Sequence, residues 1–364
     1  MRLSGTLSLY MGRQYLQHVA LVFLLVILTI LIADTIELLR RASGSDKTAT
    51  LEIVLRMASL HIPFMAQKAL PFVVLVGGIV TFAKLTRSRE LVVARAAGVS
   101  VWQFILPVLI ISALLGGLFM MVINPLASAT TARFEQMDAT HLRGSSSLMA
   151  LSKSGIWLRQ GDAEGQSVVH AERIDQDTTT LHDAIIFLYA EEDHFVGRID
   201  AAEARLEDGY WNLTDALFSA PDEPARHRAN ARIPTDLTLE RIQNSFSPPE
   251  TLSFWALPGF IDVLEESGFS SVKHHLHWHS LLAGPLLLCA MVLIAATFSL
   301  RFTRRGTWVL VAGGLLTGFL FYFLSDLVLA LGLSGKLPPI LAAWTPAGIF
   351  TLVGVAGLFH LEDG

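Results

Sequence analysis

The sequence has 364 residues, of which 52% are hydrophobic and only 16% are charged. Soluble domains carry about a quarter charged residues, so a wholly soluble protein of this length would lack polar surface. The same composition excludes intrinsic disorder. The net charge of −5 does not suggest a nucleic-acid-binding protein, and the single cysteine, Cys289, excludes internal disulfides and multi-cysteine zinc sites. The class that remains is a membrane protein that crosses the bilayer several times and carries a soluble part.

Six apolar stretches are long enough to cross a bilayer, whose hydrocarbon core needs about 20 helical residues. The first is too long for a cleaved signal peptide, and a charged helix follows it instead of an A-x-A-like cleavage site. We therefore predict a polytopic α-helical membrane protein with six transmembrane helices. The stretches lie at residues 15–33, 60–83, 101–123, 280–300, 307–331 and 337–361.

Lysine and arginine indicate the orientation, because short cytoplasmic loops are enriched in both. If the N-terminus is cytoplasmic, the cytoplasmic pieces contain Arg2, Arg13 and the basic residues of 84–95 and 301–305. The first external loop is basic as well, but the balance favours both termini in the cytoplasm.

The first apolar stretch continues into charged residues. Asp34, Glu37 and Arg41 follow i, i+3, i+7 spacing, which places them near one face of a helix. One interpretation is a ladder of ion pairs within the helix. The other is a basic rim at Arg40 and Arg41 that receives lipid phosphates, for which the arginine fork is suited. The acidic residues Asp34 and Glu37 favour the ion-pair ladder. The lipid interpretation stays open, because no pair of adjacent acids matches the two adjacent arginines.

Two charged residues, Lys68 and Asp326, lie inside apolar stretches. A charge at the centre of a transmembrane helix costs about 2.5–3.5 kcal/mol on insertion scales, so such residues usually face a cavity or a partner. Lys68 is as consistent with snorkelling toward the outer surface as with lining a cavity. Asp326 is a few residues from the outer end of its stretch, which favours a structural role.

The loop 84–100 reads KLTRSRELVVARAAGVS. The tendency of cytoplasmic loops to be positive explains its arginines, but not the apolar run 91–94 that Gly98 closes. A helix that starts near Ser88 would place Leu91, Ala94 and Val99 on one side. A short helix that docks into a groove of another protein accounts for both features, so we favour docking over a solvated loop. The candidate docking residues are Ser88, Arg89, Glu90, Leu91, Arg95 and Gly98.

Residues 124–279 have a different pattern, with short apolar runs that alternate with polar residues, as in half-buried strands. Asp208-Gly209 between two such runs predicts a hairpin turn. The simplest expectation is a β-sandwich that folds on its own outside the membrane. The expected strands lie at 156–158, 167–174, 181–190, 195–206 and 210–218.

The end of this region is expected to bring the chain back to the membrane. Five prolines within 221–250 indicate an edge or linker. Apolar residues at helical spacing then predict a short amphipathic helix over 251–267, with Gly268 as its stop. The expected domains are 1–123 with the docking helix near 86–100, the β domain 124–250, the amphipathic return segment 251–279 and the last three helices in 280–364.

No catalytic motif is visible in the chain. It lacks G-x-x-x-x-G-K-[ST], the signature of a P-loop ATPase, and it lacks H-E-x-x-H and G-x-S-x-G. Four histidines cluster before the fourth stretch, at His274, His275, His277 and His279. His275 and His279 are spaced to share a metal, but no carboxylate or cysteine adjoins them, so we favour ordinary membrane-edge residues.

This layout resembles the LptF/LptG permeases of the lipopolysaccharide exporter, and the resemblance covers essentially the whole chain. The most specific matches are SRELVVARAAGVS at 88–100 and LLAGPL at 281–286. The helix before the fourth stretch, with Gly268, also looks similar. YMGR at 10–13 and LPPILAAW at 337–344 look more like the LptG branch than the LptF branch.

The resemblance implies a permease subunit in the bacterial inner membrane, with a β-jellyroll domain in the periplasm. Members pair as a heterodimer with a related permease, LptF for LptG, and with two copies of the ATPase LptB, which binds ATP and Mg. This chain would therefore hold no cofactor, catalyse no reaction itself and bind no nucleic acid. LptC inserts a helix beside the first span of LptG and continues the jellyroll bridge toward the outer membrane.

The same resemblance assigns roles to residues. Lipopolysaccharide would enter between the first span and the fifth span of the partner permease. Arg40 and Arg41 match basic positions near the lipid cavity, and Lys68 is a further lipid-binding candidate. The segment around Glu90 would be the coupling helix seated on LptB. Asp34 and Lys68 depart from the charge pattern of some relatives, which favours a different lipid A head group.

Three other classes remain as alternatives. A lipoprotein-release permease of the ABC type places its external domain after the first span, whereas here it follows the third. A membrane enzyme acting on lipid-linked sugars would depend on the cluster from His274 to His279, its only candidate site. A structural or sensory membrane protein would need no ATPase.

Overall fold

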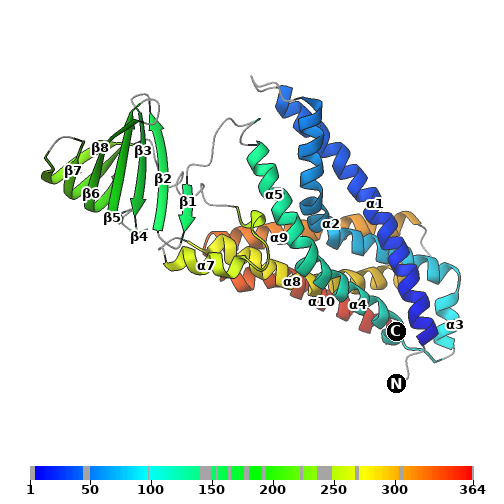
Figure 1. Ribbon diagram of the computed structural model, residues 1–364. Coiled ribbons are helices and arrows are strands. Elements are labelled where there is room, and N and C mark those ends of the chain that lie inside the picture. The colour runs from blue at the N-terminus through cyan, green and yellow to red at the C-terminus, as the bar shows by residue number, and fades with distance from the viewer. Residues whose placement is uncertain are drawn as a thin grey trace. The chain divides into compact units, whose positions relative to one another are not determined.

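The computed structural model describes most of the chain in two compact units, and each is taken by itself (Figure 1). The helical unit is Met1–Arg143 with Pro249–Leu257 and Val272–Gly364, and the β unit is Gly144–Pro248 with Pro258–Ser271. The described residues are 5–43, 50–96, 98–138, 141, 149–152, 155–162, 165–171, 173–175, 180–190, 194–207, 209–221, 224–235, 248–266, 270–302 and 307–362.

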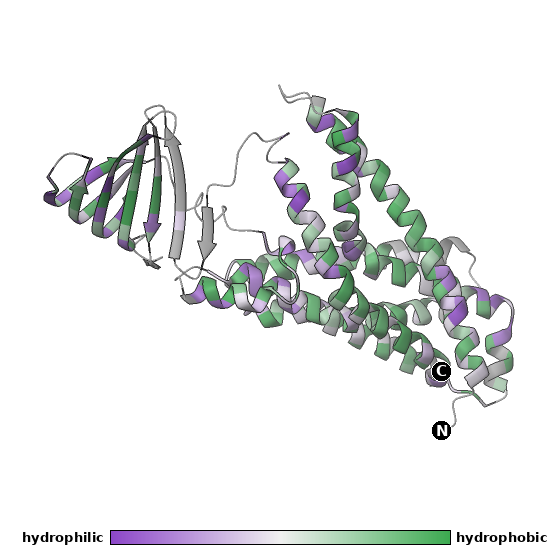
Figure 2. Cartoon of the chain, in the orientation of Figure 1, coloured by the Kyte–Doolittle hydropathy of each residue, from purple (hydrophilic) through white to green (hydrophobic). Residues whose placement is uncertain are grey.

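Within these residues, six helices are long and apolar enough to cross a membrane, which confirms the predicted number. Long parts of these helices are apolar, while polar residues gather along α5 and toward several helix ends, and the strands alternate (Figure 2). They are α1 (Gly5–Ser43), α2 (Leu51–Arg87), the continuous helix of α4 (Val101–Leu118), a π-helical turn (Phe119–Ile123) and α5 (Asn124–Asp138), then α8 (Val272–Phe302), α9 (Thr307–Leu333) and α10 (Pro339–Glu362).

The third long helix does not end at the expected residue 123. It continues through α5, because Ala127, Thr131 and Phe134 recur at helical spacing and are buried. The helical unit therefore extends to residue 143, and the β unit begins at 144 instead of 124. The fourth long helix begins at Val272, before the expected residue 280, because its polar histidine-rich first turns are helical too.

Most of the core of the helical unit comes from α1, α2, α4 and α8, with Phe321 of α9 and Phe350 and Leu358 of α10 in the same cluster. Glycines allow some of these helices to approach closely. A Cβ atom on Gly116 would lie 2.6 Å from the Cα atom of Pro285, so α4 meets α8 there without room for a side chain. Polar pairs also lie inside this core: the hydroxyls of Tyr15 and Ser112 are 2.7 Å apart between α1 and α4. Hydroxyl pairs of this kind satisfy buried polar groups where water is absent.

The strands of the β unit form one antiparallel sheet in the order β1-β2-β3-β5-β6-β7-β8, with β4 paired to β5. The two-sheet sandwich expected from the sequence is therefore wrong for the described strands, which belong to one sheet. Most of them pair with the next strand along the chain, but β3 pairs with β5 instead of β4. Their bounds are β1 Met149–Ser152, β2 Gly155–Asp162, β3 Gly165–Ala171, β4 Arg173–Asp175, β5 Thr180–Ala190, β6 His194–Glu207, β7 Tyr210–Ser219 and β8 Arg226–Pro234.

One face of the sheet holds the core of the β unit. Trp211 and Leu181 are fully buried there, and helix α7 (Leu257–Glu266) contributes Leu264 to the same cluster. Glu207 pairs with Tyr210, which confirms that β6 and β7 form the expected hairpin, while Asp208 lies outside the described residues. Helix α7 is shorter than the expected 251–267, since the chain before Leu257 forms a 3₁₀ turn and further bends.

Candidate functional site

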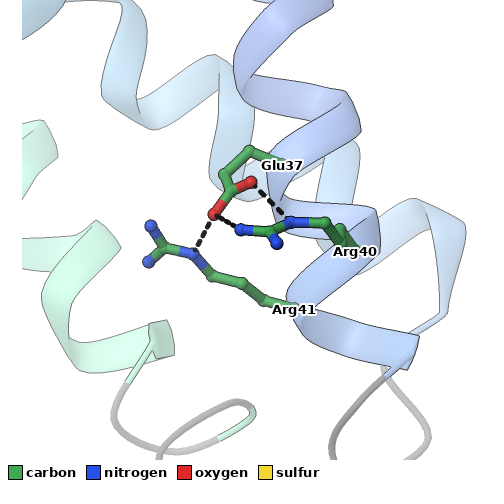
Figure 3. A network of polar contacts seen from close by, with 3 residues as sticks. All are labelled: Glu37, Arg40 and Arg41. Atoms are coloured by element: carbon green, nitrogen blue, oxygen red, sulfur yellow. Dashed lines mark hydrogen bonds and ion pairs between the residues drawn. The ribbon is translucent and has the colours of Figure 1, made fainter.

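The last turn of α1 carries a compact charged group (Figure 3). The carboxylate of Glu37 accepts hydrogen bonds from Nε and Nη2 of Arg40 and from Nε of Arg41, each 2.9 Å long. The ladder interpretation thus holds for Glu37, which neutralises part of the charge of the arginine pair. The terminal nitrogens of Arg41 point away from Glu37, so an anion can still approach that side of the guanidinium.

Asp34 does not join this group, although its spacing suggested an ion-pair ladder. Its Oδ2 atom lies 3.1 Å from Nδ1 of His61 on α2. The His61 ring also stacks on Phe134 of α5, with 4.5 Å between ring centroids and 9° between planes. Three helices therefore meet at His61, a residue that sequence reasoning missed because nothing local distinguishes it from other interface histidines.

Lys68 lies on the same face of α2 as His61. Its Nζ atom is 4.9 Å from the ring centroid of Phe64, within cation–π range. The hydroxyl of Tyr322 on α9 donates a 2.8 Å hydrogen bond to the Lys68 carbonyl. The ion pairs found among the described residues do not include Lys68, and its side chain is exposed.

The predicted docking helix is α3 (Glu90–Ala96), which connects α2 to α4. It begins at Glu90 and not near Ser88, because Ser88 caps the end of α2 and Arg89 adopts a positive φ of 61°. Leu91 is 6% exposed and belongs to the core of the helical unit, whereas Val93 is 67% exposed. Gly98, with φ of 84°, turns the chain toward α4. The side chain of Arg95 is outside the described part of the structure.

A chain of polar contacts links α3 to the start of α1. The Tyr10 hydroxyl forms a hydrogen bond with the Glu90 carboxylate. Nε2 of Gln14 donates to the same hydroxyl over 3.4 Å, and Nζ of Lys84 donates to Oε1 of Gln14 over 3.1 Å. Helix α3 therefore touches α1 in addition to the two helices that it connects. This link was not foreseen, because it joins residues far apart in the sequence.

The histidines of α8 lack the arrangement of a metal site. His275 and His279 stack with 6.3 Å between ring centroids. Among the described residues there is no group of three histidine, cysteine, aspartate or glutamate side chains that could hold a metal ion. The candidate basic residues, by contrast, lie on the neighbouring helices α1 and α2, and the docking residues follow α2 directly.

Comparison with known proteins matches this chain to one family over nearly its whole length. The model of the family described as "Lipopolysaccharide export system permease LptF/LptG" matches residues 9–360. The chain is 26% identical over 361 residues to the lipopolysaccharide export system permease protein LptG of Escherichia coli strain K12, covering 96% of this chain and 97% of that protein. It is 24% identical over 302 residues to LptG of Haemophilus influenzae, covering 81% of this chain and 82% of that protein.

Proposed function

Because the chain belongs to the LptF/LptG family of lipopolysaccharide export system permeases, we propose that it is the membrane subunit of an ATP-driven exporter that extracts lipopolysaccharide from the inner membrane. Membership and the six apolar helices make it a multi-pass inner-membrane protein and a transport subunit. The energy source, the transported lipid and the partner proteins are part of the same proposal.

Export is driven by ATP, which an LptB-like ATPase dimer hydrolyses with Mg. The ATPase is assigned to a partner because this sequence carries no P-loop. Helix α3 is the proposed contact with that ATPase. Its Leu91 is buried in the helical unit while Val93, on the same short helix, is exposed. A segment anchored on one side and apolar on the other is suited to a partner's groove. This division of α3 is the observation that carries the proposal.

The cargo is proposed to enter beside α1, between this chain and an LptF-like permease. Only 6% of the residues in the most apolar stretch of α1 are buried by the rest of this chain, so most of the helix surface is open to lipid or to a partner. The acyl chains would occupy an apolar cavity, and the lipid phosphates would meet Arg40, Arg41 and Lys68. Arginine forks and a lysine without an ion-pair partner among the described residues supply the charge for such binding.

The β unit is proposed to lie in the periplasm with both termini in the cytoplasm. It would receive the lipid and pass it to a jellyroll bridge that an LptC-like protein continues toward the outer membrane. A ligand shifts a conformational equilibrium only through its different affinity for the two states. The open cavity must therefore prefer lipopolysaccharide and the ATP-closed cavity must not.

Reconstitution tests this proposal. The chain is assembled with the ATPase and the second permease in proteoliposomes that contain lipopolysaccharide, and ATP hydrolysis and lipid release to a soluble jellyroll acceptor are both measured. We expect ATP-dependent release in the intact complex and loss of release in Glu90→Ala with the ATPase still bound. Glu52→Ala, the same exchange in the first turn of α2, should behave as wild type. Unchanged release in Glu90→Ala contradicts the coupling role, and release of a lipoprotein instead of lipopolysaccharide contradicts the cargo.

A further inference from the structure

The segment Pro249–Leu257, here called the strap, is bound to the third long helix of the helical unit. It forms a 3₁₀ turn at Pro249–Thr251 and then a turn closed by the hydrogen bond from the Leu257 amide to the Ser253 carbonyl. Phe254 is 8% exposed and Leu257 is fully buried, and both pack with Met120 and Leu281. The strap is therefore part of the packed interior of this unit.

Two hydrogen bonds fasten the strap to the helix. The backbone N–H of Phe254 donates to Oδ1 of Asn124 over 2.7 Å, and Asn124 is only 3% exposed. The indole N–H of Trp255 donates to the Met121 carbonyl over 3.2 Å. Nδ2 of the same Asn124 side chain donates to Oε1 of Gln67 on α2 over a longer 3.4 Å. The shorter hydrogen bond is the stronger one, so the main interaction of the Asn124 side chain is with the strap.

Both bonds end at the π-helical turn Phe119–Ile123 or directly after it. There the amide of Asn124 donates to the carbonyl of Phe119, five residues back, in place of the usual four. Such turns are rare and often occur at functional positions. The Met121 carbonyl lies in this turn, and the Trp255 indole supplies it with a donor from outside the helix.

A π turn inserts one extra residue into a helix. If it returned to α-helical geometry, everything after it would rotate by roughly 100°, since 3.6 residues make one turn, and would shift by about 1.5 Å. The part that would rotate is α5, which buries Ser128 and presents Arg133 outward. Packed helices change between discrete settings of this kind, because a close-packed interface is not continuously deformable.

We propose that the strap is a latch that holds the π turn and thereby fixes the rotational setting of α5, with Asn124 and Trp255 as its positioning residues. The chain continues from the strap into α7 of the β unit, so a change in the helices would reach that unit through the latch. This inference rests on the proposed export function. In addition to α3, the proposed contact with the ATPase, it makes α5 a second helix that moves during export.

The latch is tested in the assembled complex with two variants. Asn124→Ala removes the acceptor of the short hydrogen bond, and Trp255→Phe removes only the indole donor from a side chain that is 62% exposed. Trp344→Phe is the matched control, with the same exchange on α10. We expect both strap variants to lower lipopolysaccharide release about tenfold, which corresponds to about 1.4 kcal/mol, while the control releases lipid as wild type does.

The second readout follows the rotation of α5 itself. Cys289 is replaced by alanine, and single cysteines are introduced as Ser128→Cys or Arg133→Cys and labelled with a water-soluble maleimide. We expect the cysteine at 128 to be protected and the cysteine at 133 to react in the latched protein. Either strap variant should speed labelling at 128 and slow it at 133. If Asn124→Ala does not assemble, Trp255→Phe carries the same test.

Unchanged release and unchanged labelling in the strap variants, with an active wild-type complex, would overturn the latch. The labelling needs neither ATP nor a partner. A wild-type complex that fails to export would therefore count against the proposed function alone, and the labelling would still decide for or against the latch.

Discussion

Asp34 on α1 and His61 on α2 join two long helices through a contact between a carboxylate and an imidazole, with 3.1 Å between Oδ2 and Nδ1. Both side chains are largely buried, at 19% and 13% exposed. The pair lies where α1, α2 and α5 meet, and Phe134 covers the His61 ring. The acidic side chain of Asp34 is thus matched by a partner on the neighbouring helix.

Removing one member of this pair is expected to destabilise the protein. His61→Ala leaves the carboxylate of Asp34 largely buried without its partner and removes the stacked ring, so we expect a loss of about 1–3 kcal/mol in the free energy of unfolding. Unfolding of the purified protein in detergent measures this loss. A double-mutant cycle with Asp34→Asn should show coupling above about 0.5 kcal/mol, and additive losses would mean that the two groups act independently.

The close approach of α4 and α8 predicts a sharp difference between adjacent glycines. Gly116→Ala places a Cβ atom 2.6 Å from the Pro285 backbone, whereas Gly117→Ala meets nothing within 4 Å. Overpacking of this kind typically costs about 1–3 kcal/mol. Thermal unfolding should therefore show a clearly lowered midpoint for Gly116→Ala and an unchanged or slightly raised midpoint for Gly117→Ala. Equal midpoints would mean that the helices separate freely at this point.

The Glu37 carboxylate is expected to compete with lipid phosphates for Arg40 and Arg41. Glu37→Gln removes the negative charge and leaves an amide that binds the guanidinium groups more weakly. We expect tighter binding of lipopolysaccharide and slower ATP-driven release, with the gain in binding shrinking as salt is added. Binding is measured at several salt concentrations, with Glu52→Gln as the control. Weaker binding in Glu37→Gln would show that the carboxylate orients the arginines instead of competing for them.

The contact between α3 and α1 predicts an effect of a single hydroxyl. Tyr10→Phe keeps the ring but removes the group that binds Glu90 and Gln14. If movement of α3 reaches α1 through this group, ATP hydrolysis continues while lipid release falls. Tyr210→Phe, in the β unit, is the matched control. Normal release in Tyr10→Phe together with defective release in Glu90→Ala would indicate that Glu90 acts on the ATPase alone.

Hydropathy and local spacing predicted the number of long helices, the inserted β region and the hairpin at 208–209, because each depends on neighbouring residues in the sequence. The extension of the third helix through Phe134 was missed, because its mixed composition resembles a loop until its buried face is known. The single sheet was missed for a related reason: alternation identifies strands but does not state which strands pair.

The candidate site divides in the same way. The sequence alone determined which residues were charged within or beside apolar stretches, and it drew attention to Arg40, Arg41, Lys68 and the segment around Glu90. Only the tertiary structure decided the partners of these charged residues. Glu37 binds Arg40 and Arg41. His61 contacts Asp34, and Tyr10 contacts Glu90. Hydrogen bonds and ring stacking act over a few ångströms, and helices distant in the sequence come that close only after they have packed.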